Sequence, residues 1–278
     1  MKVKVVTDST AILPKDLSDE LGVTSVPVWL HFEDRSFRDG IDLDADALYR
    51  RLERGERATT SSPSPGDFVE AFQAAGKEGY DAIVVVTVSS HLSAIHDAAR
   101  AAADVCSGIP VRVVDSGSAV TGAGLVVLEA GRAAAAGSDP AAVEEAARRV
   151  AARIEVMGVV DTLRYLHRSG RVGMAKYVGG EIVGVKPMFR LSKGTVSRAG
   201  LPRSVEGGLR RLVRLVTAGS GRLHAGVFHA VAPDRAADLQ ERLARLAGGS
   251  AEIFICPFSS AMGAHTGPGV VGVGWWHS

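Results

Sequence analysis

The stretch from residue 82 to residue 116, AIVVVTVSSHLSAIHDAARAAADVCSGIPVRVVDS, decides the fold class. Residues 82–88 (AIVVVTV) form an almost entirely apolar run, residues 92–105 have the composition of an alanine-rich helix, and residues 111–114 (VRVV) are a second, mostly apolar run. A buried strand that leads through a helix into another buried strand is typical of a βαβ unit with parallel strands. The stretch therefore predicts a parallel sheet covered by helices on both faces.

The same alternation continues on both sides of this unit and gives an N-terminal α/β domain over residues 1–154. The expected elements are strand 2–6, helix 14–21, strand 25–32, helices 45–53 and 68–78, and helices 122–136 and 140–154. Each assignment follows from a period of two or of 3.6 residues in the apolar positions. The mostly parallel sheet is thus expected to lie in the first half of the chain.

The alternation of predicted strands and helices restarts at residue 155, which predicts a second, C-terminal α/β domain over residues 155–278. Its expected elements are strand 156–160, helix 162–167, a hairpin of strands 188–191 and 195–198, helix 205–218, strand 224–229, helix 233–246, and strands 251–256 and 270–275. The two halves together predict a two-domain α/β protein.

Charge and cysteine usage exclude several classes of protein. The chain has 278 residues, and its 32 Lys and Arg against 31 Asp and Glu give a net charge of +1, without the basic excess usual in nucleic-acid-binding proteins. Cys106 and Cys256 lack zinc-ligand spacing and are expected to be reduced thiols. Residues 1–9 lack the pattern of a signal peptide, and no apolar run reaches the ~20 residues that a bilayer span needs. We expect a soluble cytoplasmic protein with no nucleic-acid partner and no integral membrane insertion.

Hydroxyl-bearing residues gather where the predicted parallel strands end. They include Ser9, Ser61, Ser93 and Ser116, and residues 59–67 lead into a helix with Ser64 as N-cap. Ligands of open parallel sheets bind beyond the carboxyl ends of the strands, where free amides and hydroxyls favour an anion. Each hydroxyl alone is also explained by helix capping or by a turn. Four such segments at one sheet edge favour an anion site.

A glycine-rich segment, His265-Thr266-Gly267-Pro268-Gly269, precedes the last predicted strand. Its glycines allow the backbone to approach a ligand closely, and the imidazole of His265 is able to donate to an anion. The same five residues are also compatible with a simple turn.

Motifs of nucleotide and metal chemistry are missing from the sequence. It contains no P-loop, no dinucleotide-binding glycine fingerprint, no nucleophile elbow and no metal-ligand spacing among its histidines. We therefore expect no cofactor, no metal and no catalytic residue. Asp8 and Asp115 leave one enzymatic alternative open, a phosphotransferase or phosphate-ester hydrolase that uses the same sheet edge.

Seven motifs in order resemble the DegV family, and the resemblance runs from residue 7 to about residue 276. The motifs are Thr7-Asp8-Ser9-Thr10, Thr60-Ser61-Ser62-Pro63-Ser64 with Gly66-Asp67-Phe68, Ser89-Ser90-His91-Leu92-Ser93, Asp115-Ser116, residues 166–172 (LHRSGRV), Lys186-Pro187 and the closing HTGPG. Studied members of this family include the fatty-acid-binding subunits of bacterial fatty acid kinase.

The resemblance implies a long-chain fatty acid held in a tunnel between two domains. Its carboxylate is expected against Thr60, Ser93 and His265. The surrounding hydroxyls are expected to support this anion site, and they are Ser61, Ser9, Ser116 and Thr266. A separate kinase then phosphorylates the bound carboxylate, so that the chain is a lipid-binding carrier and not an enzyme.

Two departures from the family pattern affect these expectations. Ala94-Ile95 replaces the usual Gly-Thr beside Ser93, which is expected to narrow the carboxylate end or change the helix start. A basic segment of the type R-x-R-K-K-A is reduced to residues 203–208 (RSVEGG), where only the arginine matches. Arg171 and Arg203 are the candidates for a kinase interface, and Glu206 is expected to weaken it. A small-molecule sensor without a kinase remains an alternative.

Overall fold

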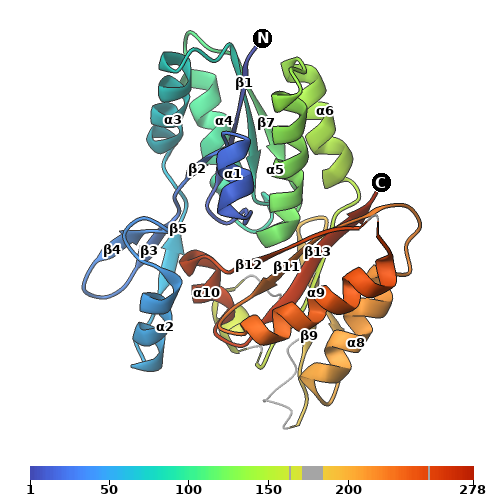
Figure 1. The fold of residues 1–278 in the computed structure, drawn as a ribbon. Coiled ribbons are helices and arrows are strands. Elements are labelled where there is room, and N and C mark those ends of the chain that lie inside the picture. Colours follow the sequence, from blue (N-terminus) through green and yellow to red (C-terminus); the bar gives the residue numbers. More distant parts are fainter. Residues whose placement is uncertain (163, 171–183, 250) are drawn as a thin grey trace.

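The structure is a computed structural model that describes residues 1–162, 164–170, 184–249 and 251–278. The described residues form three sheets, and Figure 1 shows the N-terminal parallel sheet with its helices above the sheet of the second half. Both halves combine strands with covering helices, which confirms the expected two-part α/β architecture. None of the helices among the described residues has the length and hydrophobicity to span a lipid bilayer.

The first sheet is parallel throughout, in the strand order β2-β1-β6-β7. Its strands are β1 (Val3–Asp8), β2 (Thr24–Val26), β6 (Ala82–Thr87) and β7 (Val111–Asp115). Its helices are α1 (Lys15–Glu20), α3 (Pro65–Lys77), α4 (Ile95–Val105), α5 (Val120–Ala135) and α6 (Pro140–Ala151). The βαβ unit predicted around residue 95 is therefore present.

Alternation along β6 explains why this sheet needs helices on both faces. Ile83 and Val85 belong to one buried cluster, which includes residues of α3 and α4. Val84 and Val86 point the other way, into a second cluster with residues of α5 and α6. Successive strand residues face opposite sides, so a strand that is apolar at every position is stable only between two layers.

The single strand expected over residues 25–32 is wrong, because the chain changes sheets at Pro27. Proline has no backbone N–H for a strand ladder, and the amide of Val28 donates to Ser9 Oγ at 3.0 Å instead. The chain then forms a separate antiparallel sheet in the order β4-β3-β5, beside α2. Its elements are β3 (Trp29–His31), β4 (Ser36–Arg38), β5 (Thr59–Ser61) and α2 (Ala45–Glu53).

The six-stranded sheet of the second half has the order β10-β9-β8-β13-β11-β12, in which β11 and β12 are parallel. Its strands are β8 (Glu155–Val159), β9 (Met188–Ser192), β10 (Thr195–Gly200), β11 (Leu223–His229), β12 (Glu252–Pro257) and β13 (Val271–His277). The helices of the second half are α7 (Arg164–Arg168), α8 (Val205–Val216), α9 (Pro233–Ala247) and α10 (Ser260–Thr266), of which α8 and α9 pack on this sheet. A domain boundary between residues 154 and 155, which stays a prediction, falls directly before β8.

Helix α5 packs its N-terminal end against the six-stranded sheet and so ties the two larger sheets together. Thr121 Oγ1 donates to the carbonyl oxygen of Gly226 in β11 at 2.7 Å. A Cβ atom on Gly274 in β13 would lie 2.6 Å from the backbone nitrogen of Gly122, so this approach requires glycine. The relative position of the two larger sheets is therefore set by backbone contact.

Candidate functional site

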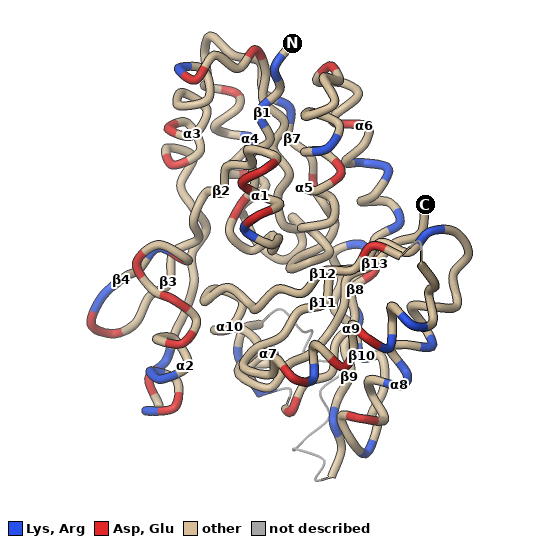
Figure 2. The backbone as a smooth tube through the Cα atoms, viewed as in Figure 1, with Lys and Arg blue, Asp and Glu red and all other residues tan. Residues whose placement is uncertain are grey.

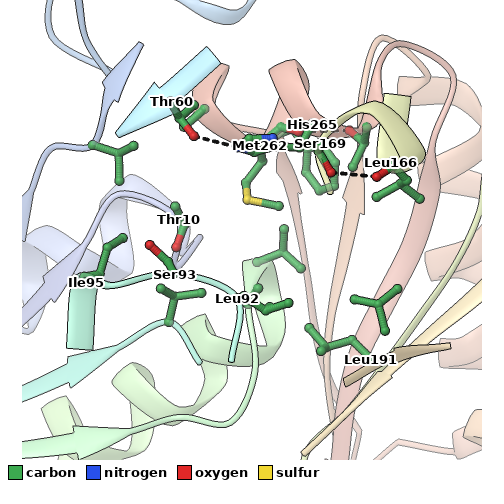
Figure 3. A pocket seen from close by; sticks show the side chains of 18 of the residues that line it. Thr10, Thr60, Leu92, Ser93, Ile95, Leu166, Ser169, Leu191, Met262 and His265 are labelled. Carbon is green, nitrogen blue, oxygen red and sulfur yellow. Dashed lines mark hydrogen bonds between the residues drawn. The ribbon is translucent and has the colours of Figure 1, made fainter. Parts of the chain in front are cut away.

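A cavity of about 350 Å³ lies where the three sheets meet (Figure 3). The loops after β1, β6 and β7 contribute to its lining, together with β5, α4, α7, α10 and the strands β8 to β10. Its hydroxyl and imidazole side chains are those of Thr10, Thr60, Ser61, Ser62, Ser93, Ser169, His265 and Thr266. The other lining residues are apolar, so the cavity combines a group of hydrogen-bonding side chains with an apolar remainder.

Thr60 and His265 meet at one side of this cavity. Thr60 Oγ1 and His265 Nε2 are 2.7 Å apart in a hydrogen bond, although the residues are 205 positions apart in the sequence. Thr60 is the middle residue of β5, and its ladder partner Leu30 is fully buried. His265 is in the last turn of α10, a short helix that the sequence pattern did not predict. The helix ends at Gly267, whose φ of 71° is in the left-handed region that favours glycine.

Ser93 faces this pair from the loop that connects β6 to α4 (Figure 3). Its hydroxyl oxygen is 3.1 Å from that of Ser62, within hydrogen-bonding distance. The structure therefore brings Thr60, Ser93 and His265 to one cavity from three separate segments. Ile95 was expected to narrow the carboxylate end of the site or to change the start of the helix. It is the first residue of α4, is almost fully buried and lines the same cavity.

The four supporting hydroxyls divide into two pairs. Ser61 and Thr266 line the cavity, where Ser61 Oγ is 2.8 Å from His31 Nε2 and Thr266 Oγ1 donates to the carbonyl of Met262. Ser9 and Ser116 are not among the lining residues of the described chain. Their hydroxyls donate elsewhere, Ser9 to Asp39 at 2.7 Å and Ser116 to the carbonyl of Ser118 at 3.2 Å. The structure thus separates Ser9 and Ser116 from the hydroxyls that line the cavity.

Each of the two aspartates of the enzymatic alternative accepts hydrogen bonds from its own loop and from the loop after β6. Asp8 is fully buried, and its carboxylate accepts hydrogen bonds from the amides of Thr10 and Val88. Burial raises the pKa of Asp8, against the lowering effect of these hydrogen bonds. Both oxygens of Asp115 accept hydrogen bonds from Ser90 or Gly117. This geometry gives no support to either carboxylate as a nucleophile.

A buried carboxylate, Asp39, orients the helix that carries His265. Its Oδ1 accepts from the amide of Ala261 in α10, and its Oδ2 accepts from Ser9 Oγ. Burial raises the pKa of Asp39, and the hydrogen bonds from Ser9 and from residues of α10 oppose this shift. Sequence reasoning missed Asp39, because its only local signal is an Asp-Gly pair, which indicates a turn.

Val120 forms part of the cavity wall in a strained backbone conformation. Its φ is 50°, a value that β-branched residues rarely adopt. The amide of Val120 donates to the carbonyl of Thr10, and its own carbonyl accepts from the amide of Ile12. Such strain persists only where surrounding contacts impose it, so the wall at Val120 is fixed by the loop after β1.

The charge around the site suits a singly charged anion. No Lys or Arg occurs among the described residues that line the cavity, so hydroxyls and the imidazole supply the hydrogen bonds. Among the described residues, no three His, Cys, Asp or Glu side chains are grouped to hold a metal ion. Hydroxyl donors beside an apolar volume match the chemistry of a carboxylate on an apolar chain.

The two arginines proposed for a kinase interface are placed differently. Arg171 lies outside the described residues. Arg203 is exposed and directly precedes Ser204, the N-cap of α8. Glu206 forms an ion pair with Arg242 of α9 at 2.7 Å, and this hydrogen bond lowers the pKa of Glu206. Figure 2 shows acidic and basic residues interspersed on α8 and α9, without a face of one sign in this view.

Comparisons with known proteins agree with the resemblance seen in the sequence. The model of a family described as uncharacterised proteins of the DegV family matches residues 2–278. A DegV domain-containing protein from Streptomyces coelicolor is 36% identical over 273 residues, which cover 98% of this chain and 97% of the relative.

Two solved structures with similar folds are described by what they bind. A DegV family protein from Thermus thermophilus, described by its fatty acid binding, has a TM-score of 0.90 and 30% identity. DegV from Bacillus subtilis, described as a fatty acid binding protein, has a TM-score of 0.89 and 27% identity. In both cases the similarity covers 100% of this chain and 100% of the other.

Proposed function

The chain belongs to the DegV family, and on that premise we propose that it binds a long-chain fatty acid in the cavity described above. The carboxylate of the fatty acid accepts hydrogen bonds from the hydroxyls of Thr60 and Ser93, and His265 completes the network by donating its Nε2–H to Thr60 Oγ1. Ser61 and Thr266 complete the polar surroundings, and the apolar lining receives the acyl chain.

The observation that carries this proposal is the division of one cavity into a hydrogen-bonding group and an apolar remainder. Thr60 and His265 are 2.7 Å apart, and Ser93 lines the same cavity. A carboxylate buried without donors is strongly disfavoured, and the hydroxyls of Thr60 and Ser93, with His265 hydrogen-bonded to Thr60, offset that cost. The fatty acid binding described for the relatives from Thermus thermophilus and Bacillus subtilis supports the same ligand class.

The finer part of the proposal is that the protein presents its ligand to another protein. A separate kinase phosphorylates the bound carboxylate in the cytoplasm, and this chain supplies no catalytic residue. The engagement of Asp8 and Asp115 in hydrogen bonds that join neighbouring loops supports a carrier more than a hydrolase. Arg203, and Arg171 outside the described residues, are the proposed contacts with the kinase.

Native mass spectrometry of freshly purified protein tests fatty acid binding directly. We expect a mass increase equal to one acyl chain per protein, and organic extraction should release a free fatty acid. Protein that carries no acyl chain after purification, and takes none up from added fatty acids, would overturn the proposal.

Presentation to a kinase has its own test, in which phosphate transfer to the bound fatty acid is measured with a bacterial fatty acid kinase. We expect Arg203→Ala to slow turnover while fatty acid binding is unchanged. Arg245→Ala, in the last turn of α9, is the matched control because Arg245 is exposed as well. Equal turnover of both variants would remove Arg203 from the interface.

A further inference from the structure

Three apolar residues form one row across neighbouring strands of the six-stranded sheet. In the ladder, Leu191 of β9 pairs with Val156 of β8 on one side and with Val196 of β10 on the other. Directly paired residues point to the same face of a sheet. All three line the cavity, so together they form a continuous strip of its wall, which we call the end wall.

The end wall is separate from the residues that bind the head group. The strands β8, β9 and β10 contribute Val156, Phe189, Leu191 and Val196 to the lining, and all four are apolar. Figure 3 places Leu191 and Thr60 at opposite sides of the cavity. A carboxylate at Thr60 therefore directs the acyl chain toward the end wall.

The end wall is anchored at the turn of the β9–β10 hairpin. The turn residues Lys193 and Gly194 have φ values of 49° and 74°. The amide of Gly194 donates to the carbonyl of Gly117 at 2.7 Å, and a Cβ atom on Gly194 would lie 2.3 Å from Ser89 Oγ. The turn thus packs on the loops that follow β6 and β7, which fixes the hairpin against the N-terminal half.

Phe189 supports the end wall from the next position on the same face of β9. Its ladder partner is Gly158, where a Cβ atom would lie 2.6 Å from the Phe189 ring. The Phe189 ring therefore occupies the space above Gly158, next to the side chain of Leu191 on the same face of the sheet. With the anchored turn on one side and this ring on the other, the end wall has little freedom to move away from a longer ligand.

We propose that Val156, Leu191 and Val196 limit the length of the acyl chain that the protein accepts. This inference rests on the proposed function and names the residues that set its chain-length selectivity. Each additional methylene that fits in the cavity strengthens binding about fourfold. A methylene that reaches past the end wall has to displace packed side chains, which weakens binding. The preferred chain is the one whose terminal methyl group contacts the end wall.

A competition experiment with end-wall variants tests this assignment. The protein is incubated with an equimolar series of saturated fatty acids of increasing length, and the bound chain is identified by native mass spectrometry. Val196→Ala should shift the preferred chain about two carbon atoms longer, because it removes two methyl groups from the wall. Val196→Leu should shift the preference to shorter chains, and Leu191→Ala should again favour longer ones.

Ser197→Ala is the matched control, because Ser197 follows Val196 on the same strand, points to the opposite face and is likewise half-buried. We expect it to leave the length distribution unchanged. Val196 is only partly buried, so its variants keep the experiment decisive if Leu191→Ala does not fold.

The outcomes separate the two proposals. The wild-type protein should prefer a defined chain length. If the Val196 variants prefer that same length, the end wall does not limit chain length, and fatty acid binding itself is unaffected by this result. Wild-type protein that takes up no fatty acid of any length would overturn the proposed function itself, and the end wall with it.

Discussion

Asp39 accepts a hydrogen bond from the backbone amide of Ala261 at 2.9 Å, across 222 positions of the sequence. Ala261 is in the first turn of α10, and His265 is in the last. The other carboxylate oxygen of Asp39 accepts from Ser9, which follows β1. Asp39 therefore fixes the helix that carries His265 relative to the parallel sheet.

Replacing Asp39 should loosen this connection. We expect Asp39→Ala to lower the free energy of unfolding by about 1–3 kcal/mol, because it leaves the buried amide of Ala261 without its acceptor. Fatty acid affinity should fall as well, since α10 then loses its anchor. Urea unfolding and a fatty acid titration measure the two effects, and unchanged affinity at reduced stability would contradict the link to His265.

Asp39 should also give stability a specific pH dependence. Its pKa is raised in the folded protein above the ordinary value of 3.8, so folding favours the protonated carboxyl group. Between 3.8 and the raised pKa the folded state binds more protons than the unfolded state, and this contribution to stability is lost as pH rises.

Asp39→Asn removes this titration and keeps an oxygen acceptor for Ala261. The free energy of unfolding of wild type minus that of the variant should therefore decrease as pH rises from 3.8. Asp8, whose pKa is also raised by burial, is present in both proteins and cancels in the difference. Parallel pH curves of urea unfolding would show that Asp39 does not titrate in this way.

Removal of a single hydroxyl should weaken carboxylate binding. Thr60→Val keeps the shape of the side chain but removes one donor, and we expect a loss of about 1–3 kcal/mol in fatty acid affinity. Ser93→Ala should have an effect of the same size. Thr59→Val is the control, because Thr59 is exposed and points to the other face of β5. Isothermal titration with one fatty acid measures the affinity of each of the three variants and of the wild type. Affinities of Thr60→Val and Ser93→Ala equal to that of the wild type would refute the carboxylate site.

Two glycines of α5 should respond differently to the same substitution. A Cβ atom on Gly124 would lie 2.1 Å from the carbonyl oxygen of Ile12, whereas on Gly131 it would meet the side chain of Leu21 at 3.0 Å. Backbone cannot move as readily as a leucine side chain, so Gly124→Ala should destabilise the protein by about 1–3 kcal/mol or more.

Gly131→Ala should be near neutral, because the gain in helix propensity of about 1 kcal/mol offsets the tight contact. Thermal unfolding of both variants makes the comparison. A larger loss of stability in Gly131→Ala than in Gly124→Ala would contradict the packing described for α5.

The turn of the β9–β10 hairpin offers a stabilising substitution. Lys193 is exposed and has a φ of 49°, which asparagine adopts more readily than lysine. We expect Lys193→Asn to raise the free energy of unfolding by roughly 0.5 kcal/mol, because an Asn-Gly pair favours this turn. A lower urea midpoint in the variant would count against the left-handed conformation at residue 193.

The sequence predicted those parts of the fold that depend on local periodicity. The strand–helix–strand unit around residue 95, the helix over 45–53 and the β9–β10 hairpin are present where they were expected. The break at Pro27 was missed, because the apolar alternation of residues 25–32 continues across it, and the choice between two sheets depends on tertiary contacts. Helix α10 was missed, because its seven residues (SAMGAHT) contain one large apolar side chain and a glycine, and so show no helical periodicity.

The candidate site could be predicted only in part from local sequence patterns. Residue type and position at the strand ends indicated an anion site, but nothing in their spacing relates Thr60 to His265. That pairing followed from the resemblance to a family, and the structure brings the two side chains together. The role of Asp39 could not be predicted from the sequence, because it depends on a hydrogen bond from a backbone amide 222 positions away.

The distance between Thr60 and His265 along the chain has a consequence for the order of folding. A contact between residues this far apart forms only after both segments have been synthesised, and closing so long a loop costs chain entropy. During synthesis, β5 and the loop after β6 leave the ribosome long before α10 is made. The cavity can therefore close only near the end of synthesis, and a nascent chain shorter than 265 residues lacks the imidazole that hydrogen-bonds to Thr60. On the proposed function, an acyl chain stabilises only the finished protein, so lipid supply would act on the last step of its maturation.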